Sequence, residues 1–105
     1  MDLKQYQLLA MKTALPTAMN TTYMALNLAA EAGEVAGKAA KARRDDWSHA
    51  QLRDTIAPEL GDVLWQLAGV CEVLGLSLDE VALSNLAKLK DRANRGTITG
   101  TGDNR

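Results

Sequence analysis

Hydrophobic side chains recur three and four residues apart along most of the chain, which is the period of an α-helix and not of a β-strand. Near the N-terminus the residues with this spacing are Leu3, Tyr6, Leu9 and Ala10. They predict a first helix over residues 2–14, which Pro16 ends or follows in the next turn. Asn20 and Thr21 are good N-caps for a second helix, which we expect to run to about Arg44.

Capping residues, a proline and a glycine predict where the next helix begins and ends. Ser48 with Gln51 resembles a capping box and opens a short helical stretch. Pro58 then either kinks that stretch or occupies the first turn of a third helix. We expect the third helix to continue to Leu74, because Gly75 suits the C′ position just beyond a helix end.

The last part of the chain predicts one more helix and a tail. Ser77 with Glu80 forms another capping-box pattern, and the fourth helix is expected to run to about Asn94. Residues 97–105 are rich in Gly, Thr and Asp, which predicts a flexible tail that is disordered or becomes ordered when something binds it. The pattern therefore predicts an all-α protein with a single domain at residues 1–96.

Composition excludes several classes of protein. The chain has 105 residues, of which 47% are hydrophobic and 4% aromatic, so it suits one small helical domain better than a β-sandwich. A helical chain this short often needs a partner subunit to bury its apolar faces. The net charge of −1 gives no basic surplus for binding a nucleic acid polymer. A single Cys71, no signal peptide and no membrane-spanning segment favour a cytoplasmic protein with no membrane partner.

Two charged residues interrupt an otherwise apolar stretch of the second helix. Over residues 23–37 large apolar side chains cover one side of the helical wheel and small ones cover the other. We therefore expect this helix to be buried nearly all round. Glu31 and Glu34 nevertheless lie within it, about 60° apart on the wheel.

The third helix repeats this arrangement. Residues 56–74 are nearly all apolar, and the main exceptions are Glu59, Asp62 and Gln66, which lie on one narrow stripe. Again two carboxylates stand three residues apart, so they project from the same face of the helix. The two helices thus each carry one acidic pair in an apolar setting.

Four carboxylates that face one another need a cation. Burying unpaired carboxylates costs several kcal/mol, and their mutual repulsion raises each pKa. Carboxylate oxygens are preferred ligands of Mg²⁺ and Mn²⁺, and acidic pairs on two packed helices converge on one metal site in helical bundles. The alternative is that each pair belongs to a solvated face or forms salt bridges, such as Glu34 with Lys38.

The fourth helix carries a basic stripe. Its members fall within about 80° on the wheel, at the edge of the apolar arc, and are Asn85, Lys88, Arg92 and Arg95. Asn85 and Arg92 are expected to point partly toward the core. Buried cations need anions, which are either phosphate oxygens or the protein's own carboxylates. The alternative is a solvated basic face near a helix C-terminus. Trp47, in the acidic loop after the second helix, is a candidate to stack on a nucleobase.

Taken together, these residues resemble the MazG-like family of all-α nucleoside triphosphate pyrophosphohydrolases. The family signature is E-x-x-E, a spacer and E-x-x-D, and here a spacer of 24 residues separates Glu34 from Glu59. Neighbouring segments also match, namely LAAEAGEVAGKAAK, ELGDVLWQLA and NLAKLKDRANRGTITGTGDNR. The resemblance covers most of the chain, from about Leu26 to the C-terminus.

The resemblance implies a fold and an activity. The protomer would be a four-helix, bundle-like unit that works as a homodimer or a dimer of dimers. It would hydrolyse (d)NTP to (d)NMP and pyrophosphate by water attack at the α-phosphorus, and a common role in the family is house-cleaning of the nucleotide pool. Mg²⁺, or Mn²⁺ in its place, would be held by the four acidic residues, which are Glu31, Glu34, Glu59 and Asp62.

The resemblance also implies substrate contacts and marks one departure. Lys88 and Arg92 look like triphosphate contacts, and Asn85 and Arg95 are further candidates. Relatives often carry an aromatic residue four positions after the E-x-x-D aspartate, where this chain has Gln66, so a relative's nucleoside preference does not transfer.

Two questions stay open at this point. The attacking water is activated either by the bound metal, which lowers its pKa, or by one carboxylate as general base, for which Glu31 and Glu34 are the candidates. The competing hypothesis for the whole protein is a non-catalytic helical dimerisation or regulatory module that retains a metal or nucleotide site. The complete acidic set and the basic stripe favour the enzyme. A different metal-dependent phosphatase or deaminase is weakly supported, because clustered His and Cys ligands are missing.

Overall fold

The computed structural model describes residues 1–103, and within that range it contains four α-helices and no β-strand. In chain order the elements are α1 (Leu3–Met11), the 3₁₀ turn η1 (Pro16–Ala18), α2 (Thr21–Arg44), α3 (His49–Val73) and α4 (Leu78–Asn94). The predicted all-α class is confirmed. None of the helices in this range is long and apolar enough to cross a membrane.

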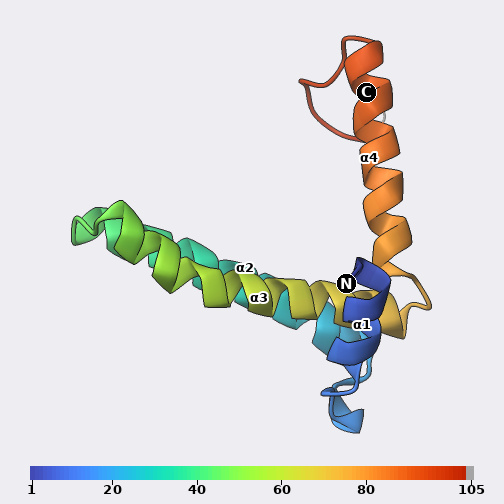
Figure 1. Cartoon of the computed structure of the whole chain (residues 1–105), viewed down its shortest axis with the longest axis horizontal. Helices are drawn as coiled ribbons and strands as arrows, with labels where there is room; N and C mark the ends of the chain where they lie inside the picture. The colour runs from blue at the N-terminus through green and yellow to red at the C-terminus, as the bar shows by residue number, and fades with distance from the viewer. Residues whose placement is uncertain (104–105) are drawn as a thin grey trace.

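The two long helices α2 and α3 pack side by side as an antiparallel hairpin, which forms an arm of the molecule (Figure 1). Their starts follow from local capping. The Asn20 side chain accepts a hydrogen bond from the Tyr23 amide at 2.8 Å, and the Ser48 hydroxyl accepts one from the Gln51 amide at 3.1 Å. Pro58 lies inside α3 without ending it, so the short stretch and the third helix predicted from the sequence are one continuous helix.

The small core lies at the base of the arm, where α1 packs against α3 and the start of α4. Ala68, Cys71 and Leu78 form its buried centre, with further apolar side chains packed around them. Cys71 is buried, and burial, followed by the charge of Glu72, raises the pKa of its thiol. Helix α1 stops at Met11, three residues before the predicted end.

One buried side chain of α1 fixes the segment that leads into α4. The Gln7 amide nitrogen donates to the Leu76 carbonyl at 3.1 Å, and its oxygen accepts from the Leu78 amide at 2.7 Å. Gly75 ends the preceding turn at φ 69°, in the left-handed region expected of a C′ glycine. The Ser77 side chain makes no capping hydrogen bond, so the second predicted capping box is wrong. Gln7 satisfies an N–H group of this helix start instead.

Helix α4 leaves the base of the arm at a steep angle and projects away from it (Figure 1). Within the described range the four helices of one chain therefore do not close into the bundle-like protomer that was expected. The radius of gyration is 16.4 Å, against about 13 Å for a compact chain of this length. The expectation that α2 is buried all round is also wrong, since its buried residues are Met24 and Ala42. Only α3 covers α2 along its length, because α4 points elsewhere.

Candidate active site

Three carboxylates meet where the middle of α2 faces the middle of α3. Glu31 comes from α2, and Glu59 and Asp62 come from successive turns of α3. Each offers a carboxylate oxygen, and these oxygens all lie within 4.8 Å of one another. Glu31 and Glu59 are half-buried, while Asp62 is exposed. The antiparallel hairpin thus brings one carboxylate of the pair on α2 to both carboxylates of the pair on α3, at a shallow position rather than a deeply buried one.

The charge of this acidic triad (Glu31, Glu59 and Asp62) is not balanced by the part of the chain that the structure describes. Loss of hydration raises the pKa of Glu31, and the neighbouring charges of Asp62, Glu59 and Glu34 raise it further. Among the described residues no ion pair involves any member of the triad. The triad is therefore a concentrated negative site that, within residues 1–103, lacks a counter-charge from a side chain.

Glu34 stands beside the triad and is not part of it. Its side chain is exposed, one turn further along α2, and its charge contributes to the raised pKa of Glu31. The salt bridge to Lys38, considered as an alternative from the sequence, is not formed within the described range. The structure thus brings together three of the four expected ligands and leaves the fourth carboxylate free nearby.

The donor set of the triad fits a hard divalent cation. Carboxylate oxygens are preferred protein ligands of Mg²⁺ and Mn²⁺, and water and substrate phosphates complete the coordination of a Mg²⁺ site. A cation there would remove the repulsion that raises the pKa of Glu31. The single histidine of the chain, His49, is exposed at the start of α3, at the opposite end of the arm from α1, and takes no part in the triad.

The basic stripe lies toward the C-terminal end of α4, and two of its side chains bind a carboxylate of the same chain. Arg92 is 4% exposed, and its Nη2 donates to the backbone oxygen of Asp103 at 3.1 Å and to Oδ1 of Asp103 at 3.2 Å. Lys88 Nζ donates to the same Oδ1 at 3.1 Å. Arg92 is therefore buried as expected, but beneath the C-terminal tail and not in the core.

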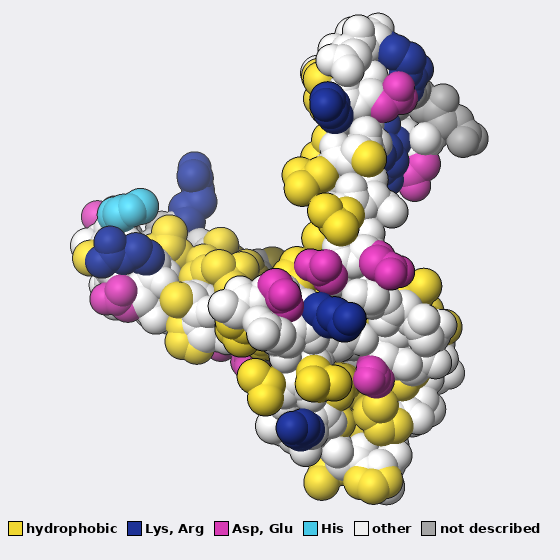
Figure 2. Space-filling model, turned by 45° about the vertical axis from the view of Figure 1, so that its right-hand side comes forward, with side chains coloured by type: hydrophobic (Ala, Val, Ile, Leu, Met, Phe, Trp, Pro, Cys, Tyr) yellow, Lys and Arg dark blue, Asp and Glu magenta, His cyan; other side chains and the backbone are white. Residues whose placement is uncertain are grey.

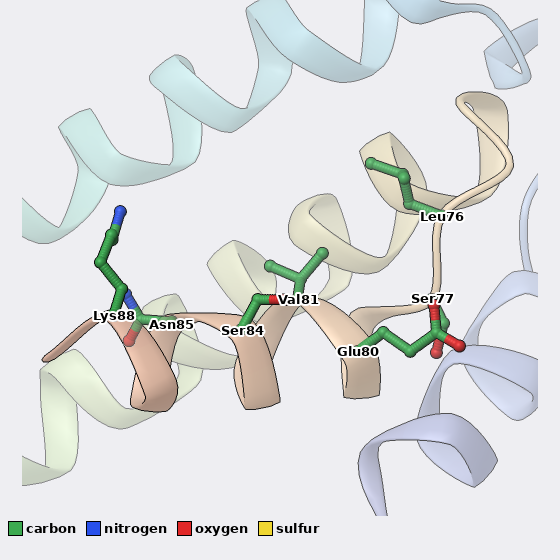
Figure 3. Close-up of a pocket in the computed structure, with 7 residues that line it drawn as sticks. All are labelled: Leu76, Ser77, Glu80, Val81, Ser84, Asn85 and Lys88. Atoms are coloured by element: carbon green, nitrogen blue, oxygen red, sulfur yellow. The ribbon is translucent and has the colours of Figure 1, made fainter. Parts of the chain in front are cut away.

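The other two members of the stripe are less engaged. Asn85 is exposed, contrary to expectation, and lines a hollow along α4 together with Lys88 (Figure 3). Arg95 is exposed, and its Nε donates to Asp91 Oδ2 on the same helix at 2.9 Å. Because α4 projects away from the arm (Figure 1), one chain does not bring this stripe to the acidic triad.

The aromatic candidate also lies apart from the triad. Trp47 is half-buried in the loop between α2 and α3, at the far tip of the arm, where its amide donates to the Ala42 carbonyl at 2.9 Å. Trp65 lies toward the base, with its Nε1 donating to Thr13 Oγ1 at 2.9 Å.

Two residues that the sequence assigned no role are prominent in the structure. Asp103 provides the carboxylate held by Lys88 and Arg92, in a tail without helical periodicity that would have revealed the contact. Gln66, one turn beyond Asp62, is 5% exposed, and its Oε1 is buried without a hydrogen-bond partner in the described part of the chain. The sequence marked Gln66 as polar on the stripe of the third helix but did not predict this burial.

Comparison with known proteins agrees with the geometry of the arm. Residues 19–97 match the MazG nucleotide pyrophosphohydrolase domain, and this range contains all of α2, α3 and α4. The chain is also 42% identical over 86 residues to the Gene 37 protein of Mycobacterium phage L5, covering 80% of this chain and 75% of that protein. No solved structure shows a significant match to the chain. The matched range includes both acidic pairs and the basic stripe, and the chain belongs to the MazG nucleotide pyrophosphohydrolase family.

Proposed function

We propose that this protein is a magnesium-dependent pyrophosphohydrolase that converts a (d)NTP to the corresponding (d)NMP and pyrophosphate. The observation that carries the proposal is the acidic triad, which gathers three carboxylates from two helices with no neutralising side chain among the described residues. Family membership agrees with it. In this reaction water oxygen bonds to the α-phosphorus, the bond from that phosphorus to the α–β bridging oxygen breaks, pyrophosphate leaves, and one proton is released.

Each charged group has a role that follows from its position. Glu31, Glu59 and Asp62 would hold the metal ion, which when bound supplies positive charge for the phosphates and lowers the pKa of nearby water. We assign Glu34 as the general base, because its exposed carboxylate lies outside the triad and stays free to accept the proton of the attacking water. Manganese satisfies the same ligands, and clearance of surplus or damaged nucleotides remains the expected role.

Lys88 and Arg92 are the proposed triphosphate contacts. A triphosphate carries about four negative charges, which a cation site and basic side chains share in phosphoryl-transfer enzymes. Arg92 offers a planar fork of N–H donors for phosphate oxygens, and Lys88 adds a compact charge one turn earlier on α4. Asn85 extends the same face of α4 and is a further candidate for a polar contact.

A second copy of the chain is proposed to bring these cations to the triad. Large hydrophobic side chains are exposed along the arm and along α4, where Figure 2 shows them on both limbs of the molecule. On the arm they are Leu26, Leu60 and Leu67, and on α4 they are Val81, Leu83, Leu86 and Leu89. Contiguous exposed apolar surface of this kind usually marks a protein interface.

The surface area supports an assembly of that kind. The chain exposes 7365 Å², whereas a compact 11.3 kDa chain exposes roughly 5,700 Å². The excess is about 1,600 Å² per chain, and a standard interface covers about 800 Å² per partner. Laying α4 of one copy on the arm of another covers this excess and pairs the basic stripe with the acidic triad. We therefore propose a homodimer, or a dimer of dimers with the same contact, whose sites combine residues of two chains.

The proposal is tested with a panel of canonical and modified NTPs and dNTPs, assayed separately for pyrophosphate and orthophosphate. Pyrophosphate release that needs Mg²⁺ and stops with EDTA is the expected result. Orthophosphate as the first product would contradict attack at the α-phosphorus. If folded protein with added Mg²⁺ or Mn²⁺ releases neither product from any nucleotide, the non-catalytic dimerisation or regulatory module replaces the enzyme.

A further inference from the structure

The C-terminal tail folds back on α4 and places one carboxylate between two cations. After α4 the chain turns at Gly96, whose φ of 71° lies in the left-handed region, and the Thr97 amide donates to the Arg92 carbonyl at 2.8 Å. The tail then returns alongside the end of α4 (Figure 1). This reversal brings Asp103 within hydrogen-bond distance of Lys88 and Arg92.

The contact is asymmetric in a way that suits a removable group. The Arg92 side chain is 5% exposed, whereas that of Asp103 is 83% exposed. Arg92 is thus covered while its partner carboxylate lies at the surface, on a segment with no helix or strand of its own. Hydrogen bonds from Lys88 and then Arg92 lower the pKa of Asp103, so this carboxylate stays charged at neutral pH.

A carboxylate and a phosphate accept hydrogen bonds from these donors in the same way. Both present anionic oxygens to ammonium and guanidinium N–H groups at about 2.7–2.9 Å when the pair is ideal. The contacts of Asp103 are longer, at 3.1 and 3.2 Å. A phosphate oxygen that takes the position of Asp103 Oδ1 gains two cationic donors at once, but it cannot do so while the tail carboxylate is there.

We propose that residues 97–103 form a strap in which Asp103 competes with the phosphates of nucleotide or pyrophosphate for Lys88 and Arg92. The inference rests on the proposed function, because it takes these two cations as phosphate ligands. Substrate binding then requires the strap to open, and the apparent affinity is lowered by the fraction of molecules in which it is open. Because the Asp103 carboxylate is exposed, each of its two ion pairs is weak, and removing its charge should tighten phosphate binding by about three- to tenfold.

The test compares the full-length wild type with Asp103→Asn and the matched variant Asp54→Asn. Asp54 is an exposed acid on α3 that pairs with Arg53 at 3.5 Å, so its variant makes the same change in net charge away from α4. Calorimetric titration with magnesium pyrophosphate measures affinity directly, and steady-state assays give KM for the best nucleotide. We expect a three- to tenfold lower Kd and a similarly lower KM for D103N, and wild-type values for D54N.

The outcomes separate the strap from the enzyme. If wild type hydrolyses nucleotides but D103N binds pyrophosphate equally or more weakly, the strap is wrong and the pyrophosphohydrolase stands. If D54N tightens binding as much as D103N, net charge and not the strap is responsible, which also overturns the inference. If wild type neither hydrolyses nucleotides nor binds magnesium pyrophosphate, the proposed function fails, and the strap fails with it.

Discussion

Mixing two inactive variants tests whether one site takes residues from two chains. Glu59→Gln removes a carboxylate of the triad on α3, and Arg92→Ala removes a cation of α4. Each variant alone should have little activity. If α4 of one copy serves the triad of the other, a mixed dimer contains one site with both defects and one site with neither.

The expected recovery follows from counting sites. Random pairing of equal amounts makes about half of all dimers mixed, and half of the sites in each are intact, so about a quarter of wild-type activity per chain returns. A site built within one chain gives no recovery at any ratio, because every chain carries a defect. Lys88→Ala replaces R92A as the basic-side variant if loss of the buried arginine impairs folding.

The assay is pyrophosphate release at saturating nucleotide after the two variants are co-expressed or refolded together. As a control, wild type is mixed with the E59Q/R92A double variant. If each site takes residues from two chains (a composite site), only pure wild-type dimers are active, and the mixture should have about a quarter of the activity of undiluted wild type. If each site lies within one chain, the mixture should have about half of that activity. An inactive mixture of single variants together with a half-active control would refute the composite site.

Three further predictions concern the arm. Asp62→Asn should abolish most turnover with helical circular dichroism unchanged, and Mg²⁺ at about 100 times its Kd should stabilise wild type by about 2.7 kcal/mol but this variant much less. Calorimetric scans with and without EDTA measure this, and an active variant with a full magnesium shift would remove Asp62 from the ligands. Folding raises the pKa of Glu31. Protonation of this carboxyl therefore stabilises the metal-free protein at pH values below the ordinary pKa of glutamate, and the stabilisation is lost as the pH rises through the raised pKa. Stability of the Glu31→Gln variant should lack that part of the pH dependence in urea titrations, and an identical dependence would contradict the assignment. Gly69→Ala should be less stable than Gly61→Ala by about 1–3 kcal/mol, since its new Cβ meets the fully buried Met24 side chain, whereas nothing lies within 4 Å at Gly61. Urea midpoints that coincide would show that Met24 moves aside at no cost.

Those parts of the fold that depend on local chemistry could be predicted from the sequence. Asn20 and Ser48 cap helices within three residues of themselves, and Gly75 ends a helix by its own backbone freedom, so these boundaries needed no tertiary information. The acidic triad was predictable for a related reason. Residues three apart share a helix face, and two consecutive long helices with a short loop pack antiparallel, which makes the faces of Glu31 and Glu59 meet.

The direction of α4 could not be predicted in the same way. It depends on two hydrogen bonds between the Gln7 side chain and the backbone of Leu76 and Leu78, which lie about 70 positions later and leave no pattern in the sequence. The apolar pattern of α2 shows that its faces need cover but not whether the same chain or another provides it. Asp103 was missed because its tail has no periodicity to relate it to Lys88. The limits of the domain, the flexibility of the tail and the cytoplasmic location stay predictions.

The hydrogen bonds between Gln7 and the segment 76–78 hold the start of α4 in place, so a rotation of α4 has its pivot at these residues. Arg92 lies 14 residues beyond Leu78, which is about 21 Å along a helix. A rotation of about 10° at the pivot therefore moves the guanidinium by roughly 4 Å, while catalytic groups tolerate only about 1 Å of misplacement. A small displacement of α1 near Gln7 thus becomes a displacement several times larger at the C-terminal end of α4. The position of the proposed phosphate contacts is thus set by the side-chain amide of Gln7, which lies at the other end of α4.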